Sequence, residues 1–439
     1  MSAPNAGGRW LRRLRDAALI LLLSVVGLLL LEGLVRLVAP QVRVTAHRSV
    51  GETLGDAHPV LGHVLRAGAD SVTRDPEFTA RYRTSVQGLR DRAVYDPRPA
   101  PGVTRVLVLG DSFTFGEASD YDAIWPVRLE SALRAEGLAI ELVKSGVPGY
   151  DTRKALLLLR ARAAQFAPDV VLHLFVPNDL FTNEPVGDAL AAPIGSPAAP
   201  AAPASPAPAP SETATPAPSA LSAQAARSRD VETLRQAKRR RPPSHLVRWL
   251  QRRLLGVDAL YVRLYARSMR GGYFVAAPTG ASADAYAVTA ALLRAMRDEA
   301  ARHGARLVVA SLPQQAQLFV AADTADAAPT ASGASFDPDA VDRQLGAAAA
   351  ALDVPWLALL PALAADYRAH GEDLYHRRDG HLNARGNAVV AAALAAQLPA
   401  VLAAESPMRS AVLLGQIMDG SAIAQRAVAR EAADGSNAG

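Results

Sequence analysis

Apolar and polar positions follow a regular alternation over most of the chain. From Arg105 onward, short continuous apolar runs, which suit strands buried on both faces of a parallel sheet, precede longer stretches of helical periodicity. In the first half the pattern predicts strands at residues 106–109, 140–143 and 170–176, and helices at 124–135 and 152–166. Repeats of this length predict right-handed crossovers between parallel strands.

The same alternation of apolar runs and helical stretches returns in the second half of the chain. It predicts a helix at residues 283–303, a strand at 306–311, a helix at 339–352, a weak strand at 354–357 and a last helix after Asn383. Together the two halves supply about five strands, so we expect an α/β fold. Residues 104–402 would then form a three-layer α/β/α domain around a mostly parallel, flavodoxin-like sheet.

Three segments that do not follow this alternation of strands and helices are predicted to be largely irregular. Residues 187–230 form an insertion whose centre is almost wholly Ala, Pro and Ser. It has too little large apolar surface to offset chain entropy, so we predict disorder. Residues 40–103, rich in Gly, Pro, Asp and Arg, read as an irregular leader with strand-like pieces, and residues 403–439 as a flexible tail.

The N-terminus joins a basic segment to an apolar one. Four arginines lie in residues 1–16, and the uncharged apolar run Ala17–Leu31 follows them. Glu32 and Arg36 are one helical turn apart and can pair near the membrane interface, which extends the usable length. We therefore predict a transmembrane signal anchor at residues 17–39, with the arginines in the cytoplasm and the rest of the chain exported.

Two other interpretations of the apolar segment are possible. A signal peptide would be cleaved, but no small-x-small site follows the run, and Pro40 stands where cleavage would be awkward. A buried core helix is disfavoured because the run is apolar on every face. An uncleaved anchor is the preferred prediction.

Charge and cysteine content narrow the possible partners. The formal net charge is +5, but the arginines concentrate in two short segments, so we expect no nucleic-acid partner. The absence of cysteine excludes disulfides and thiolate metal sites. No histidine or acidic cluster has metal-ligand spacing and no Gly-rich phosphate loop is present, so we expect neither a metal nor another cofactor.

The second basic segment precedes a short amphipathic helix. Lys238–Arg241 are all basic, and the helix carries its large apolar side chains at helical spacing: Leu246, Trp249, Leu250 and Leu254. The helix could contact anionic lipid or acidic glycan, or it could present a solvated face beside a linker. The sequence favours the solvated face beside a linker over a lipid or glycan contact. One tryptophan and three leucines need no membrane or glycan partner, because they are also enough to dock on the domain itself.

A serine follows the first buried strand directly. Gly110, Asp111 and Ser112 stand where that strand ends, and ligands of open α/β sheets bind at the carboxyl ends of strands. The alternative is a plain helix N-cap, since Asp and Ser commonly begin helices. Position at the strand end favours Ser112 as a nucleophile, and Asp111 as a brace for its loop.

A serine nucleophile needs a base to take its proton. His381 lies on the loop entering the last helix, and Asp379, two residues earlier, could hold its imidazole in the required tautomer. Asp373 and His376 form a competing pair just upstream. We favour His381 as the base.

Four ordered segments resemble the signature blocks of the SGNH (GDSL-like) hydrolases. They are Val108–Gly116, Ser145–Tyr150, Val176–Leu180 and Asp379–Asn383. The resemblance covers about residues 104–400, interrupted by the insertion, and four blocks in the family's order are far more specific than any one. It implies a catalytic triad of Ser112, His381 and Asp379.

The resemblance also implies an oxyanion hole, the set of donors that stabilises a tetrahedral intermediate. Its members would be the backbone N–H groups of Ser112 and Gly149 and the side-chain amide of Asn178, with Gly146 as an alternative donor. Relatives often have asparagine where this chain has Ser145, which puts the geometry of that loop in question.

These expectations combine into one functional hypothesis. The chain would be a serine esterase of the bacterial inner membrane, facing the periplasm or cell exterior. It would hydrolyse short acyl esters, with O-acetyl groups on cell-envelope or secreted polysaccharide as the preferred substrate. One alternative is an O-acyltransferase that uses the same residues on polysaccharide. Another is a non-catalytic envelope scaffold or glycan-binding protein, which the intact Ser, Asn, Asp and His disfavour.

Overall fold

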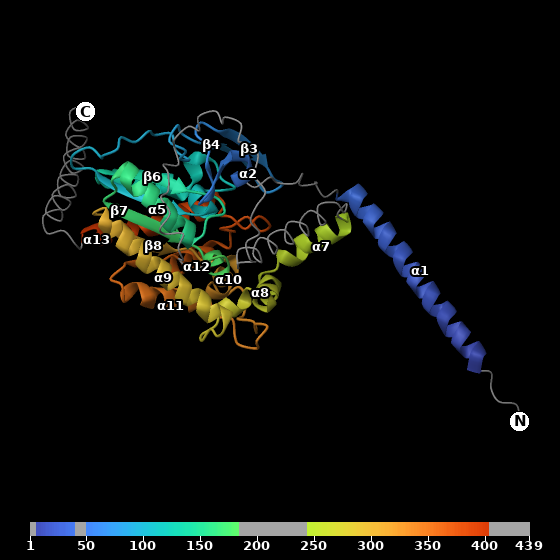
Figure 1. Ribbon diagram of the computed structural model, residues 1–439. Coiled ribbons are helices and arrows are strands. Elements are labelled where there is room, and N and C mark those ends of the chain that lie inside the picture. Colours follow the sequence, from blue (N-terminus) through green and yellow to red (C-terminus); the bar gives the residue numbers. More distant parts are fainter. Residues whose placement is uncertain (1–5, 40–49, 184–243, 404–439) are drawn as a thin grey trace, which may run out of the picture. The chain divides into compact units, whose positions relative to one another are not determined.

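The computed structural model describes residues 6–39, 50–183 and 244–403 (Figure 1). The chain divides into two compact units, residues 1–46 with 201–256, and residues 47–200 with 257–439. The first unit contains the helices α1 (Ala6–Val38) and α7 (His245–Leu255). The predicted insertion and all but the first residue of the predicted tail lie outside the described residues.

A five-stranded parallel sheet forms the centre of the second unit. Its strands are β5 (Thr104–Gly110), β6 (Ile140–Gly146), β7 (Val170–Phe175), β8 (Arg306–Ser311) and β9 (Trp356–Ala358). They lie in the order β6-β5-β7-β8-β9, and every pair is parallel. The order reverses at β5, which makes the carboxyl ends of β5, β6 and β7 a topological switch point.

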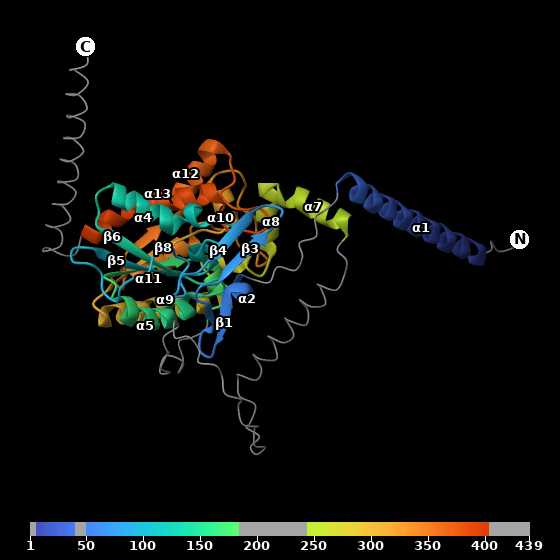
Figure 2. The ribbon, with the colours of Figure 1, turned by 90° about the horizontal axis from the view of Figure 1, so that it is seen from above.

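Helices cover both faces of the sheet (Figure 2). One face carries α4 (Trp125–Ala135), α12 (Leu360–His370) and α13 (Ala384–Ala403), and the other carries α5 (Thr152–Phe166), α9 (Ala281–Arg302) and α11 (Ala340–Ala350). The remaining elements are α3 (Ser112–Phe115), α8 (Asp258–Arg267), α10 (Gln315–Ala321), η1 (Tyr121–Ala123), η2 (Pro177–Phe181) and η4 (Gly271–Tyr273). The predicted α/β fold is confirmed, although α8, α10 and α12 were not predicted.

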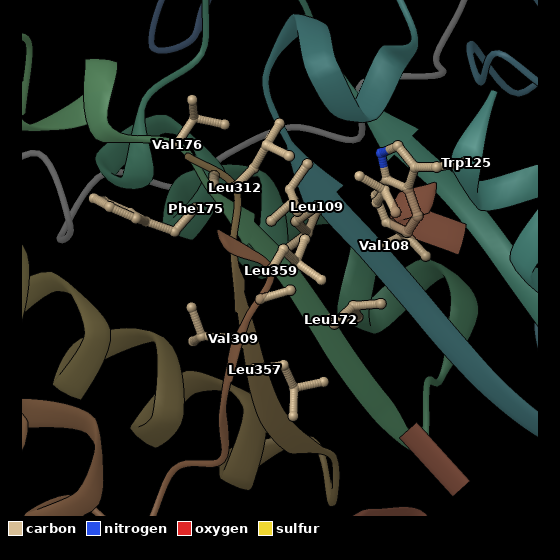
Figure 3. Close-up of a cluster of buried hydrophobic side chains, with 14 of the residues drawn as sticks. Val108, Leu109, Trp125, Leu172, Phe175, Val176, Val309, Leu312, Leu357 and Leu359 are labelled. Atoms are coloured by element: carbon tan, nitrogen blue, oxygen red, sulfur yellow. The ribbon is translucent and has the colours of Figure 1, made fainter. Parts of the chain in front are cut away.

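The core lies between these layers. Val108, Leu172 and Val309, on three neighbouring strands, are completely buried because helices cover both sides of the sheet (Figure 3). Phe175 packs against Trp356 with ring centroids 5.9 Å apart. The helix α13 is apolar and long enough to span a membrane, but its inward side chains are buried in this core, so we assign it to the domain.

The leader is part of the domain. Where an irregular segment was predicted, the structure has a short helix and two antiparallel hairpins: α2 (Val50–Leu54), β1 (Gly55–His58) with β2 (Gly62–Leu65), and β3 (Asp70–Arg74) with β4 (Thr79–Arg83). The strand-like pieces predicted for this stretch correspond to β1–β4, and their pairing into hairpins makes the stretch more regular than expected. Only alternate residues of β4 point inward, Ala80 and Tyr82, which is too few for a clear period-2 signal.

A buried charge cluster joins the leader to the sheet. Lys144 of β6 is 3% exposed, and its ammonium group lies 3.0 Å from Asp91 of the leader and 2.6 Å from Glu130 of α4. Tyr95 also donates a hydrogen bond to Asp91, at 2.6 Å. These partners offset the cost of removing the charges from water.

Replacing Lys144 should destabilise the domain strongly. In Lys144→Met the carboxylate of Asp91 stays buried without its cation, whereas Glu130 keeps its ion pair with Arg134. Leaving the charge of Asp91 unpaired should cost about 3–5 kcal/mol of unfolding free energy. Chemical denaturation of the detergent-solubilised chain measures this. Arg92→Met, which removes an exposed ion pair with Asp122, is the control and should change stability by at most about 1 kcal/mol. Equal effects of the two variants would contradict the buried cluster's importance.

Candidate active site

Three loops meet at the carboxyl edge of the sheet. Ser112 begins α3 and is separated from the end of β5 by one residue, Gly149 lies in the loop after β6, and Asn178 lies in η2 after β7. Because parallel strands end at the same edge, their order brings together residues that are far apart in sequence. His381 reaches the same edge from the loop before α13.

The structure brings Ser112, His381 and Asp379 into one hydrogen-bonded chain. Nε2 of His381 lies 2.7 Å from Oγ of Ser112, and Nδ1 lies 2.6 Å from a carboxylate oxygen of Asp379. In the tautomer with its proton on Nδ1, the imidazole donates to Asp379 and accepts from the Ser112 hydroxyl. This is the arrangement required for a serine activated by a base.

The competing pair upstream does not form. Asp373 is paired with Arg377, at 2.5 Å, instead of with a histidine. The ring of His376 packs against Phe78, with centroids 5.1 Å apart. Local geometry thus places His381, and not His376, at the serine.

Asp111 braces the turn that carries Ser112. Its buried carboxylate accepts from the N–H of Phe113 and from Nδ2 of Asn178, both at 2.9 Å. Burial raises the pKa of Asp111. The ring of Phe113 lies 4.9 Å from that of His381, whereas Phe115 is buried in the core.

The predicted oxyanion donors differ in their surroundings. Gly149 is exposed with φ +78°, and its N–H has no hydrogen-bond partner within the described part of the chain. Gly146 is buried, and a Cβ there would come within 2.4 Å of the backbone N of Phe115, so this glycine permits close packing. Nδ2 of Asn178 uses one N–H on Asp111, and a second N–H remains. Gly149 and Asn178 are therefore the better candidates.

The loop after β6 is held by the leader. Nε2 of His63 lies 2.9 Å from the carbonyl oxygen of Pro148, and the hydroxyl of Tyr150 donates to the carbonyl of His63 at 2.6 Å. Ser145, which replaces the family's asparagine, has a buried hydroxyl without a partner among the described residues. Contacts from the leader therefore hold this loop where the local side chain does not.

The leader also holds the turn that follows Ser112 and the loop before α13. Arg90, 1% exposed, donates to the carbonyls of Phe115 and Gly116 at 2.5 Å and to that of Ser119 at 2.5 Å. The carboxylate of Glu77 accepts from the N–H of Asp379 at 3.0 Å and from that of Arg378 at 3.1 Å. Sequence reasoning missed these residues, because they belong to no motif and lie far along the chain from their partners.

A further carboxylate faces the imidazole. Glu117 lies 3.9 Å from Nε2 of His381. Burial disfavours the imidazolium, but the hydrogen bond with Asp379 and the charge of Glu117 outweigh it and raise the pKa of His381 to about 9. Burial would raise the pKa of Asp379, but its hydrogen bond with His381 prevails and lowers it. Within residues 6–39, 50–183 and 244–403, no group of His, Asp and Glu is arranged to hold a metal ion.

A comparison with protein families bears on this geometry. The family model described as "SGNH hydrolase-like domain, acetyltransferase AlgX" matches residues 273–417. Residues 273–417 are thus similar to an SGNH hydrolase-like domain. The matched residues include Asp379 and His381, whereas Ser112 precedes them.

Several solved structures are similar to this chain at low identity. The psychrotrophic esterase EstA from Pseudoalteromonas sp. is 10% identical, with 68% of this chain and 98% of that chain covered and a TM-score of 0.34. The acetyl xylan esterase AlAXEase is 12% identical, with 66% and 97% covered and a TM-score of 0.33. The SGNH-hydrolase family esterase AlinE4 is 15% identical, with 70% and 100% covered and a TM-score of 0.31. A search of curated proteins found no match.

The elevated pKa of His381 can be measured. In the full-length protein, selectively labelled histidine should show one ring that titrates near pH 9 by NMR and disappears in His381→Ala. Glu117→Gln removes a negative charge that favours the imidazolium, so the midpoint should fall. Glu136→Gln, at an exposed position, should leave it unchanged. A midpoint near 6.5 both with and without Glu117 would contradict this account of the site.

Proposed function

We propose that this protein is a serine esterase that cleaves short acyl esters through an acyl-enzyme. The observation that carries the proposal is the hydrogen-bonded chain from Ser112 through His381 to Asp379. It lies at the carboxyl edge of the sheet, where α/β folds bind ligands. A buried structural serine would not need a histidine oriented by a carboxylate.

The first half of the reaction forms the acyl-enzyme. Neutral His381 takes the proton of Ser112 through Nε2 while Oγ attacks the ester carbonyl carbon. The resulting oxyanion is stabilised by the N–H groups of Ser112 and Gly149 and by the amide of Asn178. The imidazolium then donates its proton to the leaving alkoxide, the ester C–O bond breaks, and the acyl group remains on Ser112.

The second half releases the acid. His381 takes a proton from water, the hydroxide attacks the acyl carbonyl, and the proton returns to Ser112 as the carboxylic acid leaves. Only the neutral imidazole can act as the base. Because the pKa of His381 is raised to about 9, kcat/KM should increase as the pH rises toward that value.

Location guides the choice of substrate. The helix α1 is apolar and long enough to span a membrane, and Glu32 near its end accepts hydrogen bonds from residues 244–246. Those contacts favour an anchor that stays in the mature protein over a cleaved signal peptide. We propose a bacterial inner-membrane enzyme whose domain faces the periplasm or exterior and removes O-acetyl groups from envelope or secreted polysaccharide.

One observation favours a second candidate. The matching family model is named for an acetyltransferase, so the acyl group on Ser112 could pass to a sugar hydroxyl instead of to water. The two reactions share every step up to the acyl-enzyme. Mass spectrometry of an oligosaccharide acceptor, incubated with an acetyl donor and the enzyme, separates acetyl transfer from simple acetate release.

Removing the nucleophile should abolish activity without unfolding the domain. Full-length protein in detergent should hydrolyse p-nitrophenyl acetate, and Ser112→Ala should reduce kcat by at least about 10³-fold. His381→Ala should be comparably damaging, whereas His376→Ala should be mild. Ser131→Ala, on an exposed face of α4, is the control. Turnover by Ser112→Ala near that of the control would refute the proposed nucleophile.

A further inference from the structure

The apolar segment of α1 contains one acidic residue, and its carboxylate is fully engaged. Glu32 accepts from the hydroxyl of Ser244 at 2.6 Å, from the N–H of His245 at 2.9 Å and from that of Leu246 at 2.8 Å. Arg36 donates to the same carboxylate at 2.7 Å. Glu32 is therefore the N-terminal cap of α7, supplied by a different helix.

The carboxylate of Glu32 matches the chemical needs of the N-terminus of α7. The first N–H groups of a helix have no partners within it, and the helix N-terminus carries partial positive charge. A carboxylate satisfies both needs, and the helix end and Arg36 in turn compensate a charge that would be costly beside lipid. The presence of an acid in the apolar segment is thus explained by its partners.

The cap also fixes where α7 begins. Glu32 directly follows the uncharged run Ala17–Leu31. If that run spans the membrane, as proposed above, Glu32 lies at the boundary between hydrocarbon and headgroups. The first turn of α7 is then held at that boundary.

The composition of α7 suits such a place. Val247, Leu250 and Leu254 recur at helical spacing on one side and are 51%, 42% and 47% exposed. The helix has three arginines and no acidic residue. The guanidinium of Arg253 lies 5.5 Å from the ring centre of Trp249, a pairing of cation and aromatic ring that is at home among headgroups.

We propose that α7 is an interfacial helix that lies on an anionic bilayer, held there by Glu32. Its exposed apolar side enters the headgroup region, and its arginines neutralise anionic lipid. An acidic glycan would match the arginines but leave the apolar side in water, so lipid is the partner that fits both. The sequence alone favoured a solvated face because it did not reveal the partner of Glu32.

The absence of native cysteine allows a direct test. Two single-cysteine variants, Leu250→Cys and Arg252→Cys, are each labelled with an environment-sensitive fluorophore. By helical spacing, position 252 lies on the side of α7 opposite to position 250. The full-length chain is placed in nanodiscs of neutral lipid or of neutral lipid mixed with phosphatidylglycerol. Brominated lipid should quench the label at residue 250 more than that at 252, and more strongly in the anionic discs.

Breaking the cap should release the helix. Adding Glu32→Ala to Leu250→Cys should reduce the quenching, whereas Asp16→Ala, which removes the other acid of α1, should not. Equal quenching of the labels at residues 250 and 252, or no quenching of either, would overturn the proposal. A label at residue 250 that is equally shielded in detergent and in every disc would also overturn it, because it would indicate that α7 docks on the protein. Retained quenching after Glu32→Ala would overturn the role of the cap.

The quenching measurements do not depend on catalytic activity. Intact mass of the disc-bound chain shows separately whether residues 1–39 are retained. Loss of esterase activity with quenching intact would reject the proposed reaction and leave the helix assignment standing.

Discussion

The arrangement of the candidate site depends on hydrogen bonds between leader side chains and the backbones of the loops, and Arg90 is the buried one among them. Arg90 shows how strong this constraint is. Burial lowers the pKa of its guanidinium to about 10, and the carbonyls of Phe115, Gly116 and Ser119 replace the water that it has lost. Moving those carbonyls would leave a buried charge without partners, which costs several kcal/mol. The turn after Ser112 is held in place for this reason.

The same principle connects the remaining loops. Glu77 binds the backbone of the loop that presents Asp379, and His63 binds the loop that presents Gly149. A catalytic constellation has to be held to about 0.5 Å, and loops tolerate such precision only when other groups fix them. The carboxylates of Asp379 and Glu117 lie around His381 and raise its pKa, so the imidazole is protonated at neutral pH. Because only the neutral imidazole can act as a base, the site is suited to reaction above neutral pH.

Sequence and structure agree where the signal is local. The strands at 106–109 and 306–311 have continuous apolar runs, so the fold could be anticipated. Ser112 stands in a short motif after the first of these strands and His381 in a short motif before α13, so both could be named as candidates. Glu77 and Arg378 are 301 positions apart, and Glu32 and Ser244 are 212 apart. A pattern within one window cannot reveal such pairs. In the leader the sequence indicated only strand-like pieces and not their pairing, because a short strand with two inward side chains has hardly any periodicity.

The central claim is that the leader holds His381 and Asp379 so that Ser112 is nucleophilic. Reaction of the full-length protein with a fluorophosphonate, followed by peptide mass mapping, tests it most directly. We expect one adduct, on Ser112, whose rate of formation falls in Glu77→Ala and is unchanged in Arg74→Ala, an exposed position on the same hairpin. An adduct on another serine, or a rate unaffected by Glu77→Ala, would contradict the account.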